Sequence, residues 1–318
     1  MCLQIIAKLN LKCNKNPNIY HTIYEGDDFM EKIKTVRTDF CDELILKEHQ
    51  DEALSYVVKE VDDCQITHIK IEKEENVLNK EIGDYITIDF NNVHDASARE
   101  NIIRCIDTML KELVDDHTVK IDKVLVIGLG NREVVSDALG PQSTDQILVT
   151  SHLYEADKKE LLKGTRNVAA LSPGVMGQTG IESAKIVASI TTLFKPDLVI
   201  VIDALATSSL ERINSAIQIN NVGIKPGSGV GNHRMELSEK TLNCPIIAIG
   251  VATVTSIGAM LKDAMKQLKQ EELLEQLQEA IDLDLVVTPK NMDDVLYYLC
   301  IILSESINRF IHPSFERL

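Results

Sequence analysis

Three short runs of uninterrupted apolar residues constrain the fold of this 318-residue chain more than any other feature. They are residues 124–127, 198–202 and 245–251, and they alternate with glycine-rich loops and helical patterns. Strands that helices cover on both faces have such continuous apolar sequences, as in parallel sheets. The alternation therefore predicts a three-layer α/β/α domain with a mainly parallel sheet.

The region before residue 123 has a different pattern. Residues 66–72 and 85–90 alternate between apolar and polar side chains, which predicts two half-exposed strands of a small antiparallel elaboration. Residues 36–60 space their apolar side chains as a helix does, and so do residues 97–114. We therefore expect one α/β domain over residues 37–318, with an N-terminal α+β elaboration from 37 to about 120. Residues 1–36 are polar and weakly patterned, and they indicate a leader or loosely attached arm.

Four further helices are predicted from apolar periodicity in the second half of the chain, over residues 139–148, 181–194, 257–277 and 293–310. Residues 167–171 and 215–220 are expected as strands, and residues 172–180 as a loop.

The composition excludes several classes of protein. A formal net charge of −16 argues against a nucleic-acid-binding surface, which would normally be basic. No stretch reaches the roughly 18 apolar residues that a membrane span needs. The seven cysteines are scattered and include no Cys-x-x-Cys pair, so they indicate reduced thiols in the cytoplasm rather than a disulfide framework or a zinc site.

Two aspartates follow the first two apolar runs. Asp137 lies shortly after the first run, and Asp203 directly follows the second. Open parallel sheets bind ligands outside the carboxyl ends of their strands. Two carboxylates that meet there can share a proton, so that one acts as a base towards water and the other as an acid. This arrangement indicates hydrolysis, although Asp137 alone could also cap a following helix.

The loop after the first apolar run contains Gly128, Gly130 and Asn131. It begins like a dinucleotide-binding fingerprint, but Glu133 occupies the position of the third glycine. We therefore interpret these glycines as allowing the backbone to approach a peptide or a water molecule closely.

Two further glycine loops are candidates for substrate contact. Gly174, Gly177 and Gly180 precede a predicted helix, whose first N–H groups could bind an anion or a substrate carbonyl. A tight strand-to-helix turn explains them equally well. Gly229 lies in a third loop, which either lines a cleft or is only a connection.

Several stretches of the sequence resemble the germination proteases, the spore endopeptidases that degrade small acid-soluble spore proteins. The resemblance covers residues 36 to about 310, and Arg37-Thr-Asp39 looks like the start of the family's mature region. The matching stretches are residues 128–131, 137–141, 172–182, 195–199, 202–206, 223–232, 247–251 and 287–290.

The resemblance implies an aspartic-type endopeptidase whose two essential aspartates correspond to Asp137 and Asp203. It also implies a zymogen that loses a short N-terminal segment by self-cleavage, a homotetramer, and no metal or other cofactor. The implied substrates are small acid-soluble spore proteins that protect DNA, and the implied location is the cytoplasm of the spore core.

The sequence departs from the family pattern at four positions. The family usually has Trp where Arg132 stands and Pro where Ser136 stands, and Pro and Asp are expected in place of Ala252 and Ser256. These departures bear on substrate preference and processing more than on the chemistry.

Two other functions stay open. The same core resembles the hydrogenase-maturation endopeptidases, which share the Gly-x-Gly-Asn loop and a later aspartate. Those enzymes carry an Asp-Glu pair that helps to sense nickel, whereas this chain has Asp137-Ala138. The third function is that of a spore-associated binding protein with a retired catalytic site, against which the retention of both aspartates argues.

Overall fold

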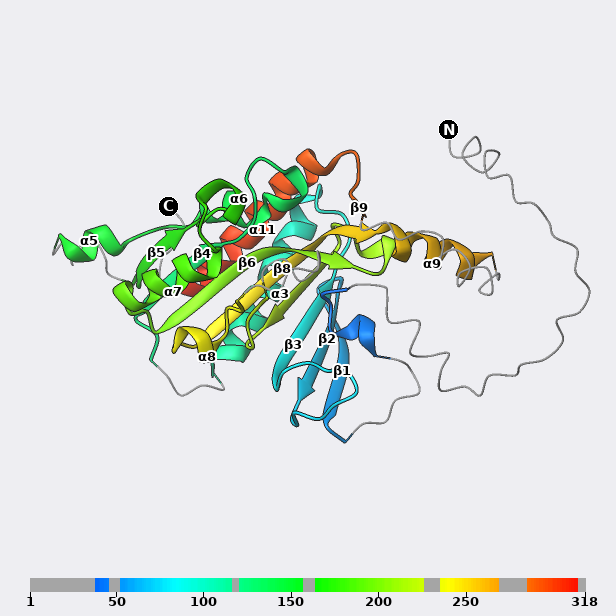
Figure 1. Cartoon of the computed structure of the whole chain (residues 1–318), viewed down its shortest axis with the longest axis horizontal. Helices are drawn as coiled ribbons and strands as arrows, with labels where there is room; N and C mark the ends of the chain where they lie inside the picture. Colours follow the sequence, from blue (N-terminus) through cyan, green and yellow to red (C-terminus); the bar gives the residue numbers. More distant parts are fainter. Residues whose placement is uncertain are drawn as a thin grey trace, which may run out of the picture. The chain divides into compact units, whose positions relative to one another are not determined.

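Nine strands form one continuous sheet in the part of the chain that the computed structural model describes (Figure 1). The predicted leader, Gly229 and the rest of its loop lie outside the described residues. The structure describes residues 38–45, 52–115, 120–156, 164–225, 235–268 and 285–313.

The sheet has a parallel and an antiparallel half. The parallel half contains, in spatial order, β5 (Asn167–Leu171), β4 (Lys123–Gly128), β6 (Leu198–Thr207) and β8 (Ile246–Ser256). The sheet continues from β8 through antiparallel pairs to β7 (Ala216–Asn220), β3 (Gly83–Asp89), β2 (Cys64–Ile71) and β1 (Leu54–Val61). A short strand β9 (Val286–Val287) also pairs with β8.

Helices cover both faces of the parallel half. Val124 and Val126 of β4 pack into a core with α3 (Ala96–Asp115) and α11 (Met292–Ile311). Leu125 and Ile127 point to the other face, where they pack in a second core with α7 (Ser183–Phe194) and α8 (Glu239–Leu242). Successive side chains of a strand point to opposite faces, so the continuous apolar run of β4 serves two cores. This confirms the predicted α/β fold with a large sheet between helices.

The remaining helices are short or lie at the ends of strands. They are α4 (Leu139–Thr144), α5 (Ser151–Glu155), α6 (Met176–Thr179), α9 (Ile257–Gln267) and the 3-10 turns η2 (Asp42–Leu44), η3 (Val135–Asp137) and η5 (Leu210–Arg212). The predicted helix over 139–148 thus ends at Thr144, and the predicted loop over 172–180 contains the single turn α6.

The prediction of a helix over residues 36–60 is wrong in the described residues: the only turn in 38–45 is η2, and residues 54–60 lie in the edge strand β1. Tyr56, Val57 and Val58 are exposed on this strand, so no alternation of burial marks it in the sequence. Asp62 and Asp63 both have positive φ angles, 50° and 65°, and connect β1 to β2. Two such residues form the tight turn that suits a β-hairpin, and this turn decides the structure against the helical spacing.

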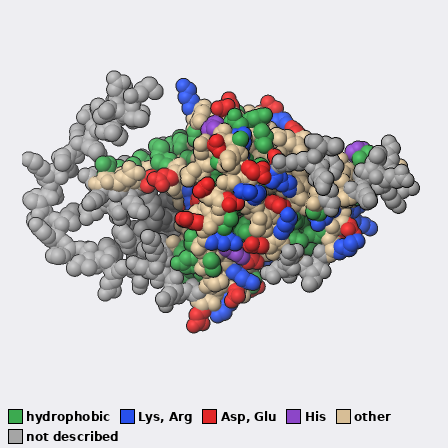
Figure 2. All heavy atoms as spheres, turned by 180° about the vertical axis from the view of Figure 1, so that it is seen from behind, with side chains coloured by type: hydrophobic (Ala, Val, Ile, Leu, Met, Phe, Trp, Pro, Cys, Tyr) green, Lys and Arg blue, Asp and Glu red, His purple; other side chains and the backbone are tan. Residues whose placement is uncertain are grey.

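The surface and the described helices agree with the composition. No described helix has the length and the apolar character that crossing a bilayer requires. On the face shown in Figure 2, Lys and Arg side chains are interspersed with Asp and Glu. The five cysteines within the described ranges are buried free thiols, as predicted for this chain: Cys41, Cys64, Cys105, Cys244 and Cys300.

Candidate active site

Asp203 lies inside β6, at the point where the neighbouring strand β4 ends. Gly128, the last residue of β4, pairs with Ile202, so Asp203 is the first residue of β6 beyond that pairing. The sequence suggested that the strand ends at Asp203. Instead, β6 continues beside β8 as far as Thr207. The side chain is buried, and its Oδ1 accepts a hydrogen bond of 2.9 Å from the N–H of Ala204.

The chain leaves β4 directly beside Asp203. The N–H of Leu129 donates to the carbonyl of Ile202 at 2.8 Å and extends the ladder by one residue. Gly130 follows with a φ of 117°, a left-handed conformation that favours glycine. A Cβ at Gly130 would lie 2.0 Å from the carbonyl oxygen of Asp137. The loop therefore folds back and packs the backbone of Asp137 against Gly130.

Asp137 is half-buried at the end of η3, a turn that contacts both β6 and β8. Its Oδ2 accepts a hydrogen bond of 2.7 Å from the N–H of Asn131. The helix-capping alternative is not observed, because Ala138 is the N-cap of α4 and no side chain caps that helix. The structure thus places Gly130, Asn131 and Asp137 beyond the carboxyl end of β4, beside the part of β6 that carries Asp203.

Glycines in this region allow close packing of the chain against itself. A Cβ at Gly128 would lie 2.2 Å from both the carbonyl of Gly140 and the hydroxyl of Thr144. A Cβ at Gly140 would lie 2.2 Å from the carbonyl of Leu129. The sequence suggested that Gly128 and Gly130 admit a peptide or water, whereas here the chain's own backbone occupies the space beside them.

The second glycine loop lies next to the first. The side-chain amide of Gln178 donates to Oδ1 of Asn131 at 2.8 Å. Gly174 and Gly180 have φ angles of 70° and 71°. The N–H of Gly180 donates to the carbonyl of Met176 at 2.8 Å, so it stabilises the turn α6 rather than a ligand.

Gly177 and Gly180 are open positions of that loop, because no heavy atom lies within 4 Å of the place either Cβ would take. Gly174 is anchored by the Ser183 hydroxyl, which donates to its carbonyl at 2.7 Å. The third loop contains Gly229, which is not described, but the N–H of Met235 just after it donates to Oε1 of Glu182 at 2.6 Å. The described end of the third loop therefore lies at the start of α7.

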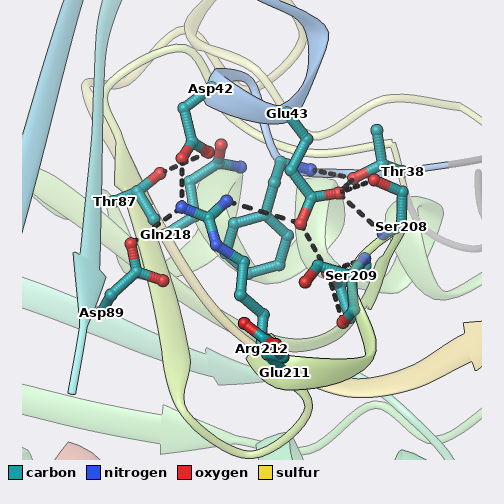
Figure 3. A network of polar contacts seen from close by, with 12 residues as sticks. Thr38, Asp42, Glu43, Thr87, Asp89, Ser208, Ser209, Glu211, Arg212 and Gln218 are labelled. Carbon is teal, nitrogen blue, oxygen red and sulfur yellow. Dashed lines mark hydrogen bonds and ion pairs between the residues drawn. The ribbon is translucent and has the colours of Figure 1, made fainter. Parts of the chain in front are cut away.

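A polar cluster that the sequence did not predict contacts the end of β6 at Thr207 and Ser208. Figure 3 shows this cluster. Its centre is Arg212, whose guanidinium lies 2.6 Å from Asp42, 2.8 Å from Asp89 and 3.4 Å from Glu43. Desolvation opposes the charged form of Arg212, but the three carboxylates raise its pKa above the usual value. Burial raises the pKa of the Asp89 carboxyl, although Arg212 favours its ionised form. No local motif reveals this cluster, because its members are far apart in the sequence.

A cavity of about 800 Å³ adjoins this cluster rather than the two aspartates. Its wall includes Asp62 and Asp63 of the β1–β2 turn together with Asp89, Glu211 and Arg212. Neither Asp137 nor Asp203 lines it. Within the described ranges, no group of three or more His, Cys, Asp or Glu residues has the arrangement to hold a metal ion.

Three of the four departures from the family pattern have clear structural surroundings. Arg132 forms a two-pronged ion pair with Asp145, at 2.5 and 2.9 Å, on the exposed loop after Asn131. The hydroxyl of Ser256 accepts a hydrogen bond of 3.0 Å from the N–H of Ala259 at the start of α9. Ala252 is fully buried. Nothing in the structure explains Ser136.

Comparison with known proteins decides the family. The sequence model of the germination proteases matches residues 38–270. The chain belongs to the germination protease family. The germination protease of Clostridium tetani is 37% identical over 79% of this chain and 86% of its own length. That of Clostridium acetobutylicum is 35% identical over 89% of this chain and 97% of its own length.

Membership of the family makes the protein a protease, which is a hydrolase that acts on protein substrates, and confirms the predicted resemblance. Among solved structures, the NiFe hydrogenase maturation protease HycI of Thermococcus kodakarensis KOD1 aligns with 52% of this chain and 96% of its own. The identity is 20% and the TM-score is 0.30.

Proposed function

We propose that this germination protease is an aspartic-type endopeptidase in which Asp137 and Asp203 activate a water molecule. The observation that carries the proposal is the register of β4 beside β6. Gly128 pairs with Ile202 and Leu129 bonds to it, so the loop that carries Asp137 begins next to Asp203. Each aspartate also accepts a backbone hydrogen bond, from Asn131 and from Ala204, that holds its carboxylate in place.

In the proposed reaction, one ionised carboxylate removes a proton from water as the water attacks the peptide carbonyl. The other carboxyl is protonated and donates to the carbonyl oxygen or to the leaving amine. Backbone N–H groups near Gly174 and Gly177 are candidates to stabilise the oxyanion, as are those of the loop around Gly229. The hydrogen bond from Asn131 and the close packing at Gly130 keep Asp137 in position for this reaction.

The proposed substrates are small acid-soluble spore proteins in the spore core. The names of the relatives support this role in germination. Exposed apolar side chains on the loops beside Asp137 suit contact with an unfolded or extended polypeptide: Val134, Val135, Met176 and Ile181. We further propose that residues 1–36 are a propeptide removed by self-cleavage before the domain 37–318, and that the enzyme acts as a homotetramer without a metal cofactor.

The test is to incubate the full chain and its Asp203→Asn variant with a small acid-soluble spore protein, with and without a chelator. We expect chelator-resistant cleavage by the natural sequence and a loss of roughly 10²–10⁴ in rate for the variant. Asp84→Asn serves as the matched control, because Asp84 is a buried carboxylate bonded to His68 away from the site. Normal turnover by Asp203→Asn would refute the assignment, and cleavage by no form, including one that begins at residue 37, would favour a retired site.

A further inference from the structure

The segment Thr38–Ile45 lies along the end of β6, just beyond Asp203. The N–H of Asp39 donates to the carbonyl of Ala206 at 2.9 Å, and the N–H of Ala206 donates to Oδ2 of Asp39 at 2.8 Å. The pairing of β6 with β8 shifts between Leu205 and Ala206, which marks a bulge. Bulges next to active sites re-aim nearby side chains. Asp39 thus binds β6 opposite this irregularity, whose extra residue is Thr253 of β8, and three residues from Asp203.

Glu43 binds the same strand a little further along. Its carboxylate accepts hydrogen bonds of 2.7 Å from both the N–H and the hydroxyl of Ser208, and one of 2.5 Å from the Thr207 hydroxyl. Thr38 of its own segment donates to it as well. The Glu43 side chain is only 6% exposed, so it is a buried anion that needs these donors and a positive charge.

Arg212 supplies the positive charge. Its guanidinium faces Asp42 and Glu43 of the segment and Asp89 at the end of β3 (Figure 3). Without it, three carboxylates that are each at most 22% exposed would face one another across this cluster. Breaking a buried ion pair by removing one partner is strongly destabilising, because the remaining charge is uncompensated. Attachment of the segment therefore depends on Arg212.

Phe40 packs the segment Thr38–Ile45 against β6. It is fully buried and packs with Leu205 of β6 and Ala252 of β8. Residues two apart in a strand share a face, so Leu205 lies on the same face of β6 as Asp203. A Cβ at Gly250, the partner of Asp203 in β8, would meet the Leu205 side chain at 2.4 Å. Leu205 is thus packed between Phe40 and the backbone next to Asp203.

We propose that Arg212 is a positioning residue for peptide cleavage. By holding Asp42 and Glu43, it keeps residues 38–45 on the end of β6 and so fixes the bulge, Leu205 and the direction of the Asp203 carboxylate. This inference rests on the proposed catalytic role of Asp203. Since Arg212 acts on the geometry of a reacting group and touches no substrate in this scheme, its loss lowers kcat and leaves KM nearly unchanged.

The test compares Arg212→Gln with Arg309→Gln in the full chain. Arg309 is a matched control, because its guanidinium also lies 2.8 Å from two carboxylates, Glu100 and Glu305, but on α11. Below the unfolding temperature of each variant, we expect Arg212→Gln to lower kcat about 10- to 10²-fold, as a misplacement of about 1 Å does. Arg309→Gln should keep its kcat. Hydrogen exchange at Ala206 and Ser208 should accelerate only in Arg212→Gln.

Arg212→Lys covers the case in which Arg212→Gln does not fold. Lys keeps the positive charge but lacks the planar guanidinium. Arg212→Lys should therefore fold and give a kcat between those of Arg212→Gln and the natural sequence. Unchanged kcat in a folded Arg212 variant, or equal losses in both arginine variants, would overturn the proposal. If instead Asp203→Asn cleaves normally, the proposed function fails, and the hydrogen-exchange result still reports on the attachment of the segment.

Discussion

The parallel and antiparallel halves of the sheet hold their carboxylates in different ways. In the parallel half, Asp137 and Asp203 accept hydrogen bonds from the backbone N–H groups of Asn131 and Ala204. In the antiparallel half, Asp84 bonds to His68 at 2.7 Å, and Asp89 pairs with Arg212.

Backbone N–H groups orient the two carboxylates of the parallel half, whereas Arg212 balances the charge of Asp89 and the His68 ring bonds to Asp84. In the proposed function, one half positions acids for chemistry, whereas the other uses acids to join elements. Substitutions that treat the two halves alike should therefore have unlike effects.

The largest effect is expected from Asp137→Asn. The amide oxygen of Asn can still accept the Asn131 N–H, so the loop should keep its shape while the exchangeable proton is lost. We expect the cleavage rate to fall by roughly 10²–10⁴, with little change in unfolding temperature. Kinetics and thermal unfolding measured on the same preparation check this. A loss of stability in step with the loss of rate would show that Asp137 is structural, like the acids of the antiparallel half.

The strands of the parallel half were predicted well from the sequence, because burial on both faces gives them continuous apolar sequences. Residues 124–127, 167–171 and 198–202 all lie in strands of that half. The two aspartates that the sequence singled out lie where the end of β4 meets β6, although β6 itself continues as far as Thr207. The strand β1 was missed because it is exposed along its length, and periodicity reports only burial.

The Arg212 cluster could not be predicted, because it joins residues of η2, β3 and η5 that only the folded chain brings together. No spacing or motif marks Asp42 or Glu43 as ligands of a guanidinium so far along the sequence. The close packing of Gly128 against Gly140 was hidden for the same reason. A glycine in a loop signals freedom of the backbone but does not say which neighbour uses the space.

The second-largest effect is expected from Gly128→Ala, which tests how closely the end of β4 must pack. The new methyl would lie 2.2 Å from the carbonyl of Gly140, and a backbone atom cannot move aside cheaply. We expect a loss of about 3 kcal/mol in the free energy of unfolding, the upper range for overpacking. Chemical denaturation measures it. Gly177→Ala is the control, because that position is open, and an equal loss there would contradict the packing argument.

A smaller effect is expected from Asp84 of the antiparallel half, whose contribution to the free energy of unfolding should depend on pH. The hydrogen bond from His68 lowers the pKa of the Asp84 carboxyl, more than burial raises it. A folded-state pKa below the unfolded value of about 3.9 means that this stabilisation is present above that value and is lost as pH falls through the folded pKa. Asp84→Asn should therefore cost about 1 kcal/mol near pH 6 and much less under acid conditions. Denaturation curves over this pH range test the sign, and a cost that grows as pH falls would contradict it.

The smallest effect is expected at the edge strand, and it sharpens the comparison with a matched substitution. Val57 of β1 is 63% exposed, and Val126 of β4 is fully buried between layers of helices. Val→Thr keeps the β-branched shape at both positions and adds one hydroxyl. At Val57 the hydroxyl reaches water, so we expect a change within about 0.5 kcal/mol in the free energy of unfolding. At Val126 the hydroxyl loses its water in the apolar core, which costs about 1–3 kcal/mol. Equal changes at the two sites would mean that β1 is covered in solution, for instance by a second copy of the chain.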